Sequence, residues 1–157
     1  MAVQLTDEEI QRLISEPKPL PADFRRRMSS KPKHGHNEGE ISITGAAGSE
    51  FYLILRQASC NPLDFSVILG YKIPQSNRIF RLCRYNGKHG EHTNKLEGQT
   101  FYGFHIHRAT ERYQEMGFKE DAYAEPTDRY SDFSGAIECA LQDGCFVGPA
   151  SPQGQLF

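Results

Sequence analysis

The sequence predicts an α+β fold: a single antiparallel sheet of about five strands, with a short N-terminal helix and two C-terminal helices. Apolar residues recur at helical spacing near both ends of the chain, whereas they alternate with a period of two in the middle. The expected strands are joined by short segments rich in Gly, Pro, Asn and Ser. Such connections are too short for parallel crossovers, so the sheet is predicted to be antiparallel.

The composition fits one cytoplasmic domain. A chain of 157 residues can bury a core without disulfide support, although 38% hydrophobic residues is a low content. There is no apolar run long enough to cross a membrane and no basic, apolar secretory leader, so neither class of protein is expected. The four cysteines lack metal-binding spacing and are predicted to be reduced, packed thiols.

The first expected element is a helix over residues 7–15. Thr6 and Glu9 form a capping-box pattern, and Leu5, Ile10 and Leu13 follow helical spacing. We therefore assign residues 1–16 to an N-terminal helix. The prolines and basic residues that follow, without periodicity, predict a linker over 17–39.

The core domain is predicted to span residues 40–147. Its expected strands are EISIT, FYLILRQA, FSVILGY, RIFRLCRY and TFYGFHIH, separated by turn sequences. A helix is expected from about Ala109 to Met116, ending at Gly117. A second helix follows in SDFSGAIECALQDG, and residues 148–157 are predicted to be a loose tail.

Charge is unevenly distributed, although the net charge is only −2. Residues 51–95 carry seven basic and two acidic residues, whereas residues 96–157 carry four basic and ten acidic ones. Two interpretations stay open: a basic face for nucleic acid, or two halves that neutralise one another.

Four histidines make the region 89–107 the candidate site. Alternation along the fifth expected strand puts His105 and His107 on the face opposite Tyr102, Phe104 and Ile106. The preceding loop adds His89 and His92. Imidazoles can perform acid–base catalysis, so these four are the predicted catalytic residues. The same residues could instead hold zinc or another divalent metal, although their spacing matches no structural zinc motif.

Basic residues flank the histidines and are expected to contact phosphate. Arg81 and Arg84 are predicted on opposite faces of the fourth strand, and Lys95 follows the His-bearing loop. Arg108 and Arg112 are expected on one side of the next helix. Two further histidines, His34 and His36, are interpreted as incidental.

A resemblance accompanies these motifs. The stretch from RIFRLCRYNGKHGEHTNK to FYGFHIHRATERYQ resembles a group of small, largely uncharacterised bacterial proteins. It is more distantly similar to TumE-type toxins of toxin–antitoxin pairs, the parallels being Arg81 to Asn86, His89/His92 and His105/His107. The likeness covers about residues 50–115, and the long N-terminal segment and C-terminal helix depart from it. It implies a ribonuclease-like protein with a neutralising antitoxin as partner.

The leading hypothesis is therefore an RNA-directed, toxin-like protein: a metal-independent endoribonuclease with no cofactor. One alternative is a non-catalytic interaction protein, a regulator or inhibitor of a host or phage complex. It would bind a protein partner through an acidic C-terminal third containing Glu120, Asp121, Glu125, Asp128 and Asp132. The other is a metal-dependent enzyme that uses the same histidines.

Overall fold

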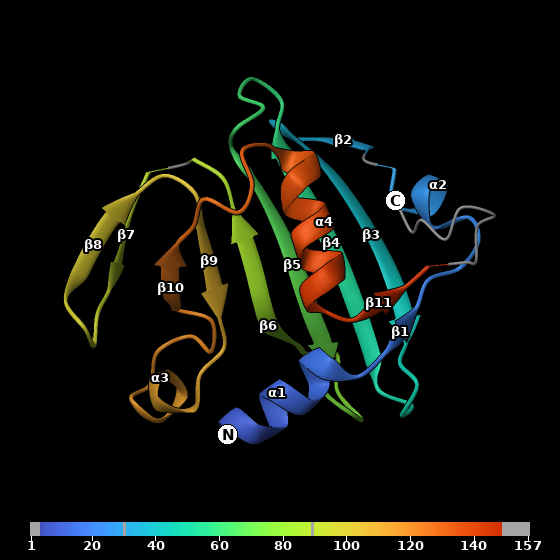
Figure 1. The fold of residues 1–157 in the computed structure, drawn as a ribbon, viewed down its shortest axis with the longest axis horizontal. Coiled ribbons are helices and arrows are strands. Elements are labelled where there is room, and N and C mark those ends of the chain that lie inside the picture. Colours follow the sequence, from blue (N-terminus) through green and yellow to red (C-terminus); the bar gives the residue numbers. More distant parts are fainter. Residues whose placement is uncertain (1–3, 30, 89, 149–157) are drawn as a thin grey trace.

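A computed structural model describes residues 4–29, 31–88 and 90–148 of the chain (Figure 1). The helices are α1 (Asp7–Ser15), α2 (Phe24–Arg27), α3 (Glu111–Glu115) and α4 (Phe133–Asp143). The strands are β1 (Lys18–Pro19), β2 (Lys31–Lys33), β3 (His36–Thr44), β4 (Glu50–Ala58), β5 (Phe65–Lys72), β6 (Ile79–Asn86), β7 (Glu91–Asn94), β8 (Gln99–Tyr102), β9 (His105–Arg108), β10 (Tyr123–Pro126) and β11 (Phe146–Val147). No helix in these ranges combines the length and the apolar composition that a membrane crossing needs.

The main sheet confirms the predicted α+β class but has seven strands, not five. Its order is β10-β9-β6-β5-β4-β3-β2, and every neighbouring pair is antiparallel. Strands β7 and β8 form a separate hairpin, which projects at the left of Figure 1. The two extra strands are β2 and β10, which have weak strand patterns because each contains a proline and lies at an edge.

One face of the sheet carries the hydrophobic core. Alternate residues of β4 and β5, such as Leu53 and Leu69, point to this face and are almost fully buried. Helix α4 crosses in front of these strands (Figure 1), and α1 adds Ile10 and Ile14 to the same core. The capping box of α1 is present as predicted, with Thr6 as its N-cap.

The expected fifth strand is divided into two. Gly103 has a φ of +89°, a conformation that favours glycine, and it separates β8 from β9. Tyr102 therefore lies on the hairpin and is 72% exposed, whereas Phe104 and Ile106 pack against the core as predicted. The break lets β8 turn away from the sheet while β9 pairs with β6.

The segment 17–39, expected to be a linker, is a packed part of the fold. It contains β1, α2, β2 and the start of β3, and it buries Leu20, Phe24 and Met28. These three apolar side chains recur every four residues, but the prolines at 17, 19 and 21 obscure this helical spacing in the sequence. Strand β1 pairs in parallel with β11, which joins the two ends of the described chain. The predicted tail lies outside the described residues from 149 onward.

Lys18 joins the C-terminal ends of two helices inside the core. Its side chain is completely buried, and Nζ donates to the carbonyl oxygens of Leu13, Ile14, Glu16 and Gly144 at 2.6–3.0 Å. The ammonium also lies 4.4 Å from the ring centroid of Phe51. Carbonyl groups at the end of a helix lack intrahelical partners, so a lysine here satisfies groups of both α1 and α4.

Candidate metal centre

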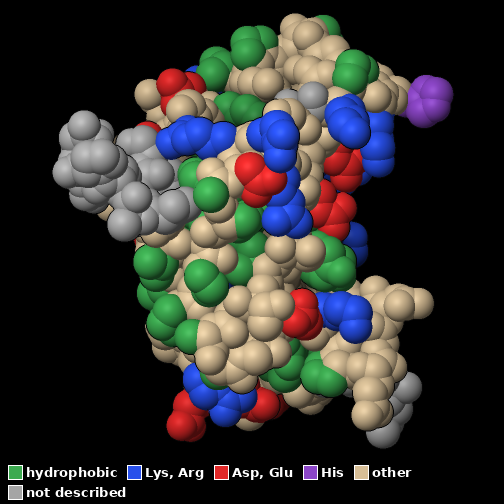
Figure 2. All heavy atoms as spheres, turned by 90° about the vertical axis from the view of Figure 1, so that its right-hand side faces the viewer, with side chains coloured by type: hydrophobic (Ala, Val, Ile, Leu, Met, Phe, Trp, Pro, Cys, Tyr) green, Lys and Arg blue, Asp and Glu red, His purple; other side chains and the backbone are tan. Residues whose placement is uncertain are grey.

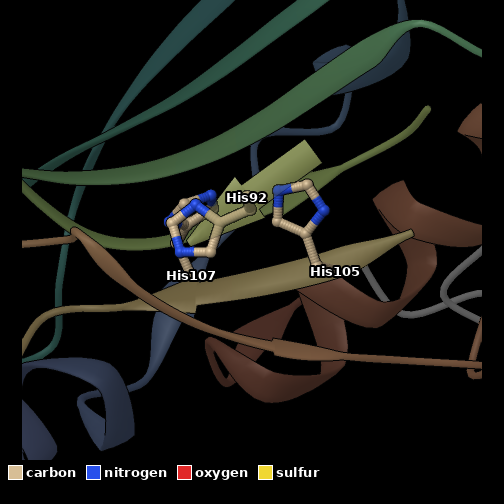
Figure 3. Close-up of side chains that lie close together, drawn as sticks. All are labelled: His92, His105 and His107. Atoms are coloured by element: carbon tan, nitrogen blue, oxygen red, sulfur yellow. The ribbon is translucent and has the colours of Figure 1, made fainter. Parts of the chain in front are cut away.

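Three of the four predicted catalytic histidines meet on the face of the sheet opposite α4. His105 and His107 project from the same side of β9, and His92 reaches them from β7 (Figure 3). Their ligand nitrogens all lie within 4.8 Å of one another. His105 and His107 are only 3% and 4% exposed, so they are not the surface histidines that a half-exposed strand usually carries. The fourth, His89, lies outside the described residues.

The alternation of β9 and its pairing with β6 build this cluster. His107 lies opposite Arg84, and His105 lies opposite Asn86, so all four side chains share one face. Ile106 points to the other face and packs against the core. The hairpin then folds His92 over the pair, with ring centroids 5.5 Å from His105 and 4.7 Å from His107.

Hydrogen bonds to carbonyl groups fix the tautomers of the two buried rings. The Nδ1 atom of His105 donates to the Gly103 carbonyl at 2.8 Å, and that of His107 donates to the Asp121 carbonyl at 2.7 Å. A carbonyl oxygen only accepts, so the proton of each neutral ring is on Nδ1. The lone pair is therefore on Nε2 in both residues; in His105 the Nδ2 of Asn86 lies 3.4 Å from this atom, and a metal ion or a proton would have to displace that donor.

Asn94 fixes the third ring. Its Oδ1 accepts from the Ala124 backbone N–H at 2.9 Å, and its Nδ2 donates to the Ala124 carbonyl at 2.7 Å. These bonds to β10 define which amide atom is oxygen, so the Nε2 of His92, 2.8 Å from Oδ1, must be the donor. The lone pair of neutral His92 is consequently on Nδ1. Asn94 is fully buried and attaches the hairpin to the edge of the sheet.

The electrostatic environment keeps His107 neutral. Burial, and next the positive charge of Arg84, lower the pKa of His107 to about 2, well below its ordinary 6.5. A neutral imidazole is the form that binds a metal ion. It also means that His107 is neither a general acid nor an effective general base at neutral pH, because a group with so low a pKa binds a proton only weakly.

Three neutral imidazoles, each with its second nitrogen bonded to an oxygen, form the donor set of many metal centres. Zinc bound at about 2.0–2.1 Å separates two nitrogen ligands by about 3.4 Å in tetrahedral geometry. One nitrogen of each ring lies within 4.8 Å of a nitrogen of each of the others, so the rings would move closer by up to about 1.4 Å on binding. The residues therefore fit a metal ion after a small adjustment.

Arg81 and Arg84 lie near the cluster but are paired with carboxylates. A register shift after Leu69 adds one residue to β6, so both arginines point to the same face and not to opposite faces. Their Nε atoms lie 3.6 and 3.1 Å from the Oδ2 of Asp121, which is fully buried. The other oxygen of this carboxylate, Oδ1, has no hydrogen-bond partner among the described residues.

The remaining predicted phosphate contacts are dispersed. The Nζ of Lys95 lies 6.0 Å from the ring centroid of Phe118. Arg108 ends β9 on the core face and donates to Gln11, so it does not precede Arg112 on a helix as expected. Helix α3 begins only at Glu111, because Thr110 is its N-cap, and Arg112 pairs with Glu97.

Charge pairing supports the second interpretation of the uneven charge distribution, mutual neutralisation. Glu120 and Asp121, predicted to belong to an acidic surface, are buried beside Arg78, Arg81 and Arg84. The side of the molecule formed by α2 and the β2 edge shows Lys and Arg side chains with acidic groups between them (Figure 2). The ion pairs on that side are Arg26–Asp23, Lys33–Glu38 and Arg56–Glu38.

Sequence reasoning missed the residues that support the histidines. Asn94 and Asp121 act through partners far away in sequence, at Ala124 and on β6 and β9, and no local pattern indicates such contacts. Gly103 did carry a signal, since a glycine inside a strand pattern often marks a break or a bulge. The buried carbonyl groups that accept from the histidines have no signature in sequence.

A family model described as "Family of unknown function (DUF6978)" matches residues 5–142. The chain belongs to this family. The matched range of this DUF6978 member includes the whole seven-stranded sheet, the β7–β8 hairpin and the three clustered histidines. No curated protein and no solved structure matches the chain.

Proposed function

We propose that this DUF6978 member binds one divalent transition-metal ion, best matched by zinc, through His92, His105 and His107, and uses it in a hydrolytic reaction. One observation carries this proposal: each imidazole donates one N–H to an oxygen, and one nitrogen of each ring lies within 4.8 Å of a nitrogen of each of the other two. Second oxygen partners of this kind orient the rings of metal-binding histidines and raise their basicity.

The chemistry of such a centre follows from its ligands. Three neutral nitrogen donors leave at least one coordination position open, as in catalytic zinc sites. A zinc ion there would lower the pKa of a bound water to about 7. The guanidinium of Arg84 is on the same face as His107 and bonds Asp121 through Nε, and its other N–H groups would favour a substrate that develops negative charge, such as a phosphodiester. RNA is the phosphodiester substrate that the sequence resemblance implies.

The metal-independent endoribonuclease stays a second proposal, favoured by the position of Arg84 opposite His107. A TumE-like activity of this kind would need one imidazole as base and another as acid. A pKa of about 2 makes His107 a weak base, so the base and the acid of this alternative would be His105 and His92. An antitoxin would be the expected protein partner.

Metal content tests the first proposal directly. Protein purified without an affinity tag that binds metal is expected to contain about one zinc, or another divalent ion, per chain. The His105→Gln/His107→Gln double variant should lose the ion, whereas His34→Gln, at an exposed position, should retain it. A wild-type protein that neither contains a metal nor gains thermal stability from added zinc would contradict the proposal.

RNA cleavage then separates the functional alternatives. Labelled single-stranded and structured RNA would be incubated with the wild type in excess EDTA and, separately, with added zinc. Cleavage only with zinc supports a metal-dependent enzyme, and cleavage in EDTA supports metal-independent acid–base chemistry. Absence of cleavage in both, with metal bound, favours a non-catalytic interaction protein, for which capture of one protein partner is the next measurement.

A further inference from the structure

A cavity of about 550 Å³ opens on the other face of β9, the face that carries the core. Helix α1 contributes Gln11 and Ile14 to its wall, β9 contributes Ile106 and Arg108, and α4 contributes Asp143. Its volume lies within the range of about 300–1,000 Å³ that is typical of small-molecule sites. None of the three clustered histidines lines it, so it is distinct from the candidate metal centre.

The charged groups around the cavity differ in whether they have a partner of opposite charge. Arg129 donates two hydrogen bonds to the carboxylate of Asp143, at 2.8 and 2.9 Å, so this pair is neutral. Glu125 is exposed to solvent and accepts from the Tyr123 hydroxyl. Arg108 donates to the uncharged amide oxygen of Gln11, and it forms no ion pair with a carboxylate in the described part of the chain. Its charge is thus available to an anion.

The inner wall of the cavity is apolar and uncharged. Ile14 and Ile106 are core residues, and the thiol of Cys83 lies beside them. Burial raises the pKa of Cys83 to about 12, so the thiol keeps its proton at neutral pH. An anion that enters the cavity therefore meets no thiolate.

We propose that this cavity binds a small organic anion, with its carboxylate or phosphate group on the guanidinium of Arg108 and its apolar body against Ile14 and Ile106. A guanidinium presents a planar set of donors that matches both head groups with two parallel hydrogen bonds. The apolar wall would raise affinity with the length of the attached chain, by about fourfold for each methylene that becomes buried. Asp143 is already paired with Arg129, but Glu125 has the uncharged Tyr123 hydroxyl as its partner, so an organic cation is the control that the test must include.

Titration with matched probes tests this site. Hexanoate, hexyl phosphate and hexylamine would each be added to the full-length protein in excess EDTA while backbone amide NMR signals are recorded. The proposal expects saturable shifts at residues 106–108, 123–125 and 127 with at least one of the two anions and none with the amine. The anion that binds more tightly identifies the head group. Saturation by neither anion, or equal binding of the amine, would overturn the proposal.

Two arginine variants provide the control. Arg108→Gln should weaken binding of the anion at least tenfold, because it removes the charge but keeps a polar side chain. Arg112→Gln makes the same charge change outside the cavity, on an exposed residue of α3, and should leave binding unchanged. Equal affinity of Arg108→Gln and the wild type would overturn the proposal. Since EDTA is present throughout, the result is independent of whether the histidines bind a metal.

Discussion

His107 and Asp121 are joined by a hydrogen bond of 2.7 Å from the Nδ1 atom of the ring to the backbone carbonyl. The carboxylate of the same aspartate pairs with Arg84, which lies opposite His107 in the sheet. Asp121 therefore fixes the tautomer of His107 through its backbone and holds the neighbouring arginine through its side chain. One residue thus links the candidate metal centre to the charge network of β6.

The stability of the metal-free protein is expected to fall as the pH drops below about 6.5. The pKa of His107 is lowered to about 2 in the folded state, so between these values the unfolded chain binds a proton that the folded chain does not. This residue alone should reduce the free energy of unfolding by about 2 kcal/mol between pH 7 and pH 5. Urea unfolding in EDTA at both pH values measures it.

The variant His107→Gln should lack this part of the pH dependence, because it has no titrating group at that position. His34→Gln changes an exposed histidine and should retain the wild-type dependence. Identical loss of stability in the wild type and in His107→Gln would show that His107 is not responsible.

Asn94 is expected to control metal affinity without being a ligand. Asn94→Ala removes the acceptor that orients His92 and both bonds to Ala124, so zinc affinity should fall about 10–100-fold. Competition with a chromophoric chelator would measure it. Thr93→Ala, on the exposed side of the same strand, should bind zinc like the wild type. Unchanged affinity in Asn94→Ala would argue against a metal centre that includes His92.

Asp121→Asn should destabilise the protein by about 3 kcal/mol, because it leaves Arg84 without its buried counter-charge, whereas Arg81 keeps Glu120. The backbone carbonyl that accepts from His107 is still present in this variant. Guanidinium chloride unfolding measures the change, and Asp128→Asn, an exposed substitution, should be near neutral. A change of less than about 1 kcal/mol would mean that solvent screens the arginines.

Replacement of Lys18 should be among the most damaging single changes. Lys18→Met keeps much of the side-chain volume but leaves four carbonyl groups at two helix ends without their donor. We expect a loss of at least about 3 kcal/mol in the free energy of unfolding. Lys31→Met, on the exposed edge strand, is the matched control. Equal stability of the two variants would contradict a role for Lys18 in joining α1 and α4.

The sequence was informative where a pattern is local. Alternation along residues 105–107 predicted that both histidines oppose Ile106, and Thr6 with Glu9 predicted the start of α1. The pairing of β6 with β9 and the approach of His92 depend on long-range contacts. The sequence alone does not determine such contacts. The register shift after Leu69 has no sequence signature. For this reason Arg81 and Arg84 are predicted on opposite faces of β6, whereas the structure has them on the same face.

Strand β9 is only four residues long and separates the two proposed sites. His105 and His107 project from one side of it, and Arg108 projects from the other. Deleting Ile106 would place His105 and His107 on opposite sides of the strand, because side-chain direction alternates at every position. One of the two histidines would then face the apolar cavity. Length changes in the loop between β7 and β8 carry no such penalty. Both sites therefore depend on the length of this strand.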